Sequence, residues 1–491
     1  MLYKKTNGWK NISQEKAEKI FSMGEEYKKV LDIGKTEREF VNFSEELAKE
    51  CGFVDAKSKE RLVPGDRVYY INREKNIVLA VIGKDDILKG INYVVSHIDS
   101  PRLDLKANPL YEEFELAYMK THYYGGIKKY QWASIPLALH GVVILSDGTK
   151  VQIIIGERET DPVFTVPDIL PHLDRQVQGD RKAREVIKGE ELQIIVGSIP
   201  SLIKDDEIKE LVKYSVLERL NEVYGIEEED FVSAELELVP SQKARDIGID
   251  RSLIGAYGQD DRICGYTSLR AILDIKGIPQ RTAVCFLADK EEIGSEGSTG
   301  LQSEYLEYFT SDMIARVKGN YSDLYLRETL WNSKALSSDV TVGIDPIYKS
   351  VNDEQNTAKL NYGIVITKYT GAGGKYDTND ADAEYIGEIR RLLNENNVKW
   401  QTGMLGKVDE GGGGTVAKYL AKKGIRTIDA GPALLAMHSP FEVSSKLDVY
   451  ETYKTYQVFY QEIVHGEQKY ITKSNKKIGR ASCRERVSSP V

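Results

Sequence analysis

The first fifty residues carry apolar side chains at helical spacing. They recur at steps of three and four residues, which places them on one face of a helix: Phe40, Phe43, Leu47 and Cys51. Thr36 and Glu39 stand just ahead with the spacing of a capping box, in which both side chains satisfy free amides at a helix start. The pattern predicts a helix from residue 36 whose apolar face packs on the protein core.

From Asp66 the spacing becomes that of strands. Residues 66–83 alternate and then turn continuously apolar, and residues 91–97 form a second apolar run that ends in polar residues. Residues 107–245 resemble a series of hairpins, with Asp147 and Gly148 as a tight turn. After Asp260 short apolar strands alternate with helical segments, which is typical of α/β layers.

These patterns predict an α/β fold in two sequence pieces. We expect a catalytic domain with a mixed central sheet flanked by helices, formed by residues 1–106 and 246–473. A β-rich domain of residues 107–245 is inserted between the two pieces. Residues 474–491 are expected to form a disordered tail. No repeat of solenoid period and no long low-complexity tract is visible.

Composition excludes several classes of protein. The chain has 491 residues, 29% of them charged and 41% hydrophobic, which is ordinary for a globular protein. Its net charge of −9, without a basic run, argues against nucleic acid and anionic membranes as partners. No apolar run reaches transmembrane length and no secretory signal is visible. The 4 cysteines lack metal or disulfide spacing, so we expect a reducing, cytoplasmic location.

The last residues, 478–491, differ from the rest of the chain. They read IGRASCRERVSSPV and show no apolar periodicity. The run IGRASCRERV resembles a translated sequencing-adapter fragment. We therefore expect this segment to be an artefact and exclude it from the fold prediction.

Candidate catalytic residues follow predicted strands. His97 ends the apolar run 91–97, and Asp99 lies two residues on, so that both side chains point the same way and Asp99 can accept the second ring N–H of His97. Glu291 and Glu292 follow the buried run TAVCFLAD, where two adjacent carboxylates would repel each other without a cation. One glutamate could bind a metal while the other acts as a general base.

Three further residues are weak candidates when taken singly. Asp260 stands at a predicted helix start, where it could simply favour the helix dipole or could bridge two metals. Asp339 and His438 lie in predicted loops, where such residues are usually ordinary turn or surface residues. Their order along the chain, after His-x-Asp, is what makes them informative.

In that order the motifs resemble those of the aspartyl aminopeptidase and aminopeptidase I family of dinuclear zinc exopeptidases. The motifs are VSHIDSPRLDLK, GQDDRICG, DKEEIGSEGS, SSDV and AMHSPFE. The resemblance continues through the predicted insert, for example at Tyr124-Gly125-Gly126, Val166-Pro167 and His172-Leu173, and reaches to about residue 473.

The resemblance implies a role for each candidate. Asp260 would bridge two metal ions, His97 and Asp339 would complete the site of one ion, and Glu292 and His438 that of the other. Glu291 would be the general base, with Asp99 supporting His97. Zinc is expected from this mixture of imidazoles and carboxylates, and manganese or cobalt would also be accepted.

The resemblance also implies an assembly and a substrate pocket. The insert would build dimers and then a tetrahedral dodecamer, with His172 reaching a neighbouring active site. Lys368 and Lys375 match the segment that selects acidic N-terminal residues, but the glycines around them and the run Gly411–Gly414 differ from acid-specific members. Acidic and neutral N-terminal residues therefore both stay open as substrates.

Other functions remain open at this stage. The chain could be a tetrahedral glutamyl or leucyl aminopeptidase, or a dinuclear amidohydrolase or deacetylase with a similar metal site. It could also be an inactive assembly protein of the same fold. The complete set of ligands together with Glu291 favours an active aminopeptidase.

Overall fold

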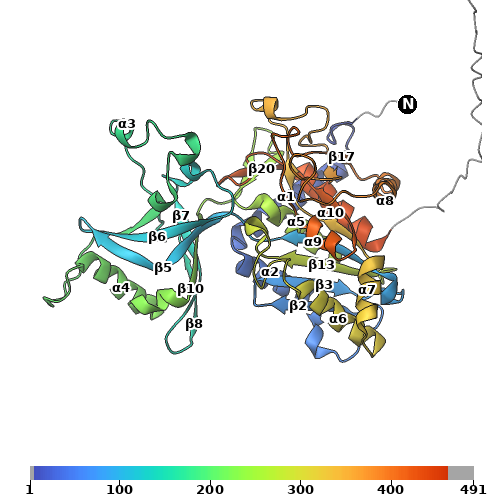
Figure 1. Cartoon of the computed structure of the whole chain (residues 1–491), viewed down its shortest axis with the longest axis horizontal. Coiled ribbons are helices and arrows are strands. Elements are labelled where there is room, and N and C mark those ends of the chain that lie inside the picture. Colours follow the sequence, from blue (N-terminus) through green and yellow to red (C-terminus); the bar gives the residue numbers. More distant parts are fainter. Residues whose placement is uncertain (1–4, 463–491) are drawn as a thin grey trace, which may run out of the picture.

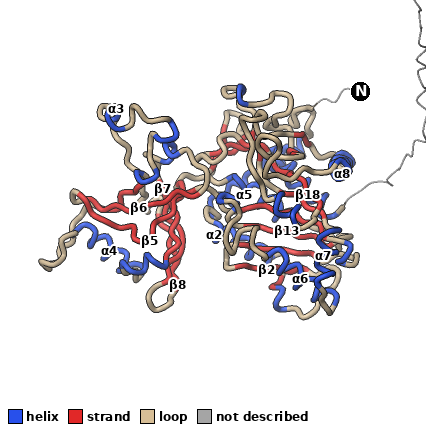
Figure 2. Tube along the Cα trace, in the orientation of Figure 1, coloured by secondary structure: helices blue, strands red, loops and turns tan. Residues whose placement is uncertain are grey.

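The computed structural model describes residues 5–462, which form two lobes, each built on its own sheet (Figures 1 and 2). The predicted tail and adapter-like segment, residues 474–491, lie outside these residues. No helix in the described range is long and apolar enough to cross a membrane.

The larger lobe contains a mixed sheet of nine strands. Their order across the sheet is β1 (Val54–Asp55), β2 (Arg67–Asn72), β3 (Asn76–Val81), β13 (Thr282–Ala288), β4 (Ile91–His97), β14 (Lys334–Ser337), β18 (Arg426–Gly431), β16 (Ile364–Thr367) and β17 (Trp400–Thr402). The central strands β13, β4, β14 and β18 are parallel to their neighbours in this group. Their carboxyl ends therefore meet along one edge.

Helices cover both faces of this sheet, which explains the continuously apolar strands. Along β4, Val94 points into one core, whereas Tyr93 and Val95 point into the other. The first core receives side chains from α1 (Gln14–Ile33), α2 (Glu37–Glu50), α5 (Gln259–Leu273), α8 (Ala383–Glu395) and α10 (Lys446–Gln461). The second receives side chains from α6 (Tyr305–Lys318), α7 (Asp323–Asn332) and α9 (Ala417–Lys422). The predicted mixed α/β sheet flanked by helices is thus confirmed.

The smaller lobe is an antiparallel sheet of six strands. They run in the order β8 (Lys150–Ile155), β7 (Leu137–Ile144), β10 (Ala234–Pro240), β5 (Arg102–Glu113), β6 (Leu116–Tyr124) and β9 (Gln193–Gly197). Helix α4 (Leu211–Tyr224) packs Val212 into the core of this lobe, and α3 (Asp174–Val177) lies at its outer end (Figure 1). The sheet is formed by residues within and just ahead of the predicted insert.

Two small sheets complete the described strands. One joins β11 (Arg245–Ile247), β12 (Leu253–Ala256) and β20 (Glu442–Ser445), and the other joins β15 (Thr341–Val342) and β19 (Ala433–Leu434). These sheets hold the start of α5 next to the chain segment around residue 438.

Local signals read from the sequence are present in the structure. Thr36 caps α2 in a capping box, where its hydroxyl accepts from the Glu39 amide while the Glu39 carboxylate accepts from the Thr36 amide. The turn between β7 and β8 uses Gly148 with a φ of 86°, a conformation that favours glycine. The predicted apolar stripe packs on the first core, with Phe40 fully buried.

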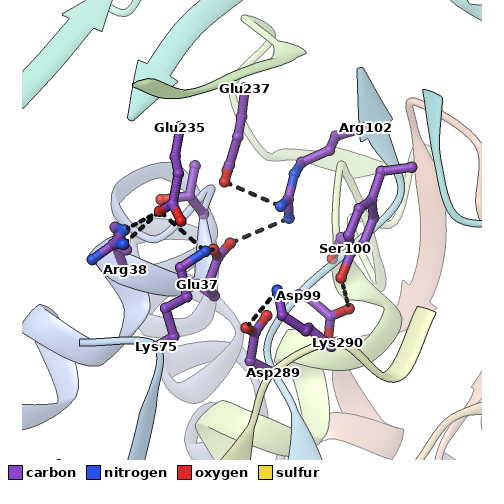
Figure 3. Close-up of polar contacts among 12 residues, drawn as sticks. Glu37, Arg38, Lys75, Asp99, Ser100, Arg102, Glu235, Glu237, Asp289 and Lys290 are labelled. Atoms are coloured by element: carbon purple, nitrogen blue, oxygen red, sulfur yellow. Dashed lines mark hydrogen bonds and ion pairs between the residues drawn. The ribbon is translucent and has the colours of Figure 1, made fainter. Parts of the chain in front are cut away.

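Buried ion pairs join the two lobes. Arg102 of β5 lies between Glu37 of α2 and Glu237 of β10, with nitrogen–oxygen distances of 3.2 and 3.1 Å (Figure 3). Lys75, from the turn between β2 and β3, lies 3.0 Å from Glu37. All four side chains are buried. Removing one partner of such a pair costs about 3–5 kcal/mol because the remaining charge is uncompensated, so these side chains depend on one another across the junction.

Candidate metal centre

Three adjacent strands deliver most of the candidate residues. β13, β4 and β14 are parallel neighbours, and Ala288 at the end of β13 lies opposite His97 at the end of β4. Glu291 and Glu292 follow β13 in a short 3-10 turn, Glu291–Ile293, and Asp339 lies two residues beyond β14. The strand ends thus bring these four side chains to one edge of the sheet, where sites in open α/β sheets are formed.

Two other segments reach the same edge. Asp260 lies at the start of α5, where the backbone of Asp260 and Asp261 is not helical and the peptide bond between them is cis. His438 lies in the connection between β19 and β20 with a φ of 64°. The two small sheets hold both segments over the carboxyl ends of the central strands.

The carboxylate of Asp260 lies between the two histidines. Its Oδ1 is 3.1 Å from Nε2 of His97, and its Oδ2 is 3.2 Å from Nε2 of His438. Each oxygen of one carboxylate therefore faces a different imidazole. This is the arrangement that a carboxylate bridging two metal ions requires.

The remaining acids lie around this centre. Glu292 Oε2 is 3.5 Å from His438 Nε2, and Asp339 Oδ1 is 3.9 Å from His97 Nε2. Glu291 Oε2 is 4.0 Å from His97 Nε2. The structure therefore brings together all five residues predicted as ligands and the predicted base.

The donor atoms are close enough to hold metal. Three groups have ligand atoms within 4.8 Å of one another: His97 with Glu291 and Asp339, His97 with Asp260 and Glu292, and Asp260 with Asp261 and Asp339. Glu291 thus has a place among the donors as well as the position expected of a base. Asp261, to which the sequence assigned no role, belongs to the third group.

The electrostatics of the cluster favour a bound cation. Burial raises the pKa of Glu291 to about 7 and raises the pKa of Glu292 and of Asp339 well above the usual range. Although burial alone would lower it, the pKa of His438 is raised to about 11 by its hydrogen bond with Asp260. Four carboxylates thus share a buried space with two imidazoles, and a divalent cation would allow the acids to ionise together.

The residues also fit a metal at the level of single atoms. Among the described residues, the buried Oε1 of Glu292 has no hydrogen-bond donor, and Oδ1 of Asp260 has none apart from its 3.1 Å contact with Nε2 of His97. Buried carboxylate oxygens are otherwise nearly always paired, so these atoms are available as ligands. Imidazole and carboxylate donors together suit zinc.

Asp99 and Glu442 support the cluster through hydrogen bonds to the backbone of its residues. His97 Nδ1 lies 3.1 Å from the backbone carbonyl of Asp99 and 3.2 Å from its Oδ1, and that Oδ1 accepts from the amide of Glu291 at 3.1 Å. Glu442 accepts from the backbone amides of Asp260 at 3.1 Å and of His438 at 2.7 Å. The sequence did not indicate this role of Glu442, although its position in AMHSPFE was a signal.

The three candidate substrate residues lie apart from this cluster. His172 is exposed and lies two residues before α3. Lys368 and Lys375 are partly exposed and both pair with Asp380, at 3.7 and 2.9 Å. Among the described residues, the contacts of the metal cluster involve none of these three side chains.

Comparison with known proteins identifies the family. Residues 30–460 match the family described as aminopeptidase I zinc metalloprotease (M18). A probable M18 family aminopeptidase 1 of Borrelia garinii subsp. bavariensis is 56% identical over 94% of this chain and 100% of its own length.

Solved structures agree with this match. The crystal structure of an M18 aminopeptidase from Thermotoga maritima superposes with a TM-score of 0.90 at 47% identity, covering 94% of this chain and 100% of the other. The mApe1 dodecamer of S. cerevisiae shares the fold at 21% identity and a TM-score of 0.71, with coverage of 89% and 96%. The chain therefore belongs to the M18 family of aminopeptidase I zinc metalloproteases and is an aminopeptidase.

Proposed function

We propose that the cluster binds two divalent metal ions, with Asp260 as the bridging ligand. His97 and Asp339 complete the site of one ion, and Glu292 and His438 complete that of the other. The observation that carries this assignment is that the two oxygens of Asp260 face different histidines, at 3.1 and 3.2 Å. Zinc suits these donors best, and manganese and cobalt accept the same ligands.

Glu291 is the general base in this proposal. Two bound ions would supply the Lewis acidity that polarises the scissile carbonyl and activates a water. Glu291 takes the proton from that water and later gives it to the leaving amine. Glu291 Oε2 lies 4.0 Å from His97 Nε2, next to the proposed ligands, so it can reach a water bound there. Its side chain is 18% exposed, so a substrate can reach it.

Replacing Glu291 by Gln tests this role. The E291Q variant should retain its metal, because the five proposed ligands remain, and lose turnover by about 10²- to 10⁴-fold, the usual contribution of a general base. Metal content and kcat are measured on the same preparation. Glu296→Gln, on an exposed side chain of the same segment, is the matched control and should keep its activity. Near-normal turnover in E291Q would contradict the assignment.

We propose peptides with an acidic or neutral N-terminal residue as substrates. Lys368 and Lys375 follow β16 and share Asp380, so the three side chains together keep one net positive charge. Gly413 donates to the carbonyl of Thr370 at 3.2 Å, which places the glycine run against the same segment. We propose that this segment lines the substrate pocket. Its single net positive charge is compatible with both acidic and neutral N-terminal residues.

Aminoacyl anilides with free and blocked amines test the exopeptidase reaction. The enzyme should release p-nitroaniline from leucyl and aspartyl p-nitroanilides and not from their N-acetylated forms, because substrate binding requires the free α-amine. The ratio of the two free substrates in kcat/KM then gives the preferred residue. Equal hydrolysis of acetylated substrates would favour an amidohydrolase or deacetylase instead.

We propose that residues 107–245 form the assembly domain of a homo-oligomer, up to a tetrahedral dodecamer built from dimers. His172 would contribute to the active site of a neighbouring subunit. Support comes from apolar side chains exposed on either side of it, Leu170, Leu173 and Val177, which a second subunit would bury. The fold is shared with the mApe1 dodecamer.

Mixing two inactive variants tests the action of His172 in a neighbouring subunit. H172A and E291Q subunits, unfolded and reassembled together, should regain activity, because some sites combine an intact Glu291 with a His172 from the neighbour. A mixture of H97A and E291Q is the control and should stay inactive, since both residues act within one subunit. Absence of activity in the first mixture, with assembly verified by light scattering, would contradict the proposal.

We also propose a cytoplasmic location. Cys51, Cys264 and Cys285 are unpaired thiols. Reducing compartments keep cysteines in this state, which supports the location expected from the sequence.

A further inference from the structure

We propose that the last residue of strand β6, Tyr124, and the two glycines after it, Gly125 and Gly126, position both histidines of the metal centre, so that the smaller lobe is part of the catalytic apparatus of its own subunit. This inference rests on the proposed two-metal site and assigns a positioning role to residues outside it. Tyr124 belongs to the six-stranded sheet of the smaller lobe, and Gly125 and Gly126 follow it directly. The proposed ligands from strand ends lie in the nine-stranded sheet of the larger lobe.

Tyr124 acts through Asp99. Its hydroxyl donates to Asp99 Oδ2 at 2.8 Å, and both side chains are buried. The same carboxylate accepts from the amides of Glu291 and Glu292 at 3.1 and 3.2 Å, and its Oδ1 lies 3.2 Å from His97 Nδ1. His97 Nδ1 also lies 3.1 Å from the backbone carbonyl of Asp99, so Asp99 holds this ring through two oxygens. Its carboxylate additionally holds the turn that carries the proposed base, and Tyr124 fixes the orientation of that carboxylate.

Gly125 and Gly126 reach the other half of the centre. The carbonyl oxygen of Gly126 lies 2.8 Å from Nδ1 of His438. By accepting the N–H of this nitrogen, the carbonyl fixes the orientation of the ring. Gly125 has a φ of 76°, and a Cβ added there would lie 3.4 Å from Oε2 of Glu292. The backbone can thus pass the proposed ligands closely because neither residue has a side chain.

The β6 end is itself held by the buried junction between the lobes. Tyr124 lies opposite Arg102 in the antiparallel pairing of β6 with β5. The Arg102 guanidinium lies 4.1 Å from the centre of the Tyr124 ring and forms ion pairs with Glu37 and Glu237. Figure 3 shows Arg102 between these two acids, with Asp99 nearby. A continuous series of contacts thus connects the junction between the lobes to the proposed metal ligands.

Because Tyr124 orients a partner of a proposed metal ligand, its removal should change metal affinity, which the loss of a merely structural residue would not. Partners that orient metal-bound histidines typically change metal affinity by 10- to 100-fold when they are removed. Tyr124 contacts Asp99 and the Gly126 carbonyl contacts His438, so their loss should change metal affinity and kcat more than KM.

Replacing Tyr124 by Phe tests the proposal. Zinc affinity of the metal-free protein is measured by competition with a chromophoric chelator, together with kcat and KM. Y124F should bind one of two zinc ions about tenfold more weakly, lower kcat and leave KM nearly unchanged. Tyr123→Phe, at the neighbouring exposed ring, is the matched control and should behave like the wild type.

A double-mutant cycle with Asp99→Asn separates positioning from general destabilisation. If Tyr124 acts through Asp99, Y124F should cause no further loss of zinc affinity in the D99N background. Wild-type zinc affinity in Y124F, or the same tenfold loss with and without Asp99, would overturn the proposal. Wild-type protein that binds fewer than two zinc ions would instead contradict the proposed metal centre.

Gly126→Ala provides a second, independent test. The added Cβ would lie 3.3 Å from Nδ1 of His438, so the ring must move and zinc affinity should fall. Gly387→Ala is the control, because a Cβ at that position meets no atom within 4 Å. Unchanged zinc affinity in folded G126A would count against the positioning role.

Discussion

The structure around the site depends on the electrostatic problem posed by four buried carboxylates. Asp260, Glu291, Glu292 and Asp339 lie within a few ångströms of two imidazoles. Two unit charges 4 Å apart interact by about 4 kcal/mol at an effective dielectric constant of about 20, so several ionised acids repel strongly without compensation. A divalent cation bound among these acids adds attraction that outweighs this repulsion, so the acids can be buried together in a folded protein.

The fold meets this constraint by bringing distant segments together on a rigid frame. Parallel strands β13, β4 and β14 end at one edge and deliver His97, both glutamates and Asp339. Glu442, buried in β20, fixes the backbone of Asp260 and His438 through one carboxylate. The junction at Arg102 then fixes the smaller lobe against the same edge. Ligand geometry is therefore determined by elements from almost the whole described chain.

The sequence predicted the ligands better than their supports. His97 and Glu292 stand at the ends of predicted strands and Asp260 stands at a predicted helix start, whereas Asp339 and His438 became candidates for ligands only through the family resemblance of their motifs. The roles of Glu442 and Tyr124 could not be derived, because they depend on contacts between segments 182 and 25 residues apart that no local pattern encodes.

The surroundings of the proposed substrate-binding residues could not be predicted from local sequence patterns either. Lys368 and Lys375 could be picked out as basic residues near glycines, but their common pairing with Asp380 follows from the folded loop. His172 stands exposed in the described chain, and its proposed role concerns a second subunit. Local sequence predicts which residues have useful chemistry, whereas tertiary and quaternary contacts decide what charge and partner each one has.

Zinc stoichiometry tests the central claim most directly. After removal of free metal, elemental analysis of the wild-type chain should give two zinc ions per subunit, and Asp260→Ala should lose both, because its two oxygens face both halves of the site. His438→Ala should retain one. A wild-type subunit that holds a single zinc ion, or a D260A variant that still binds two, would contradict a carboxylate-bridged pair of metals.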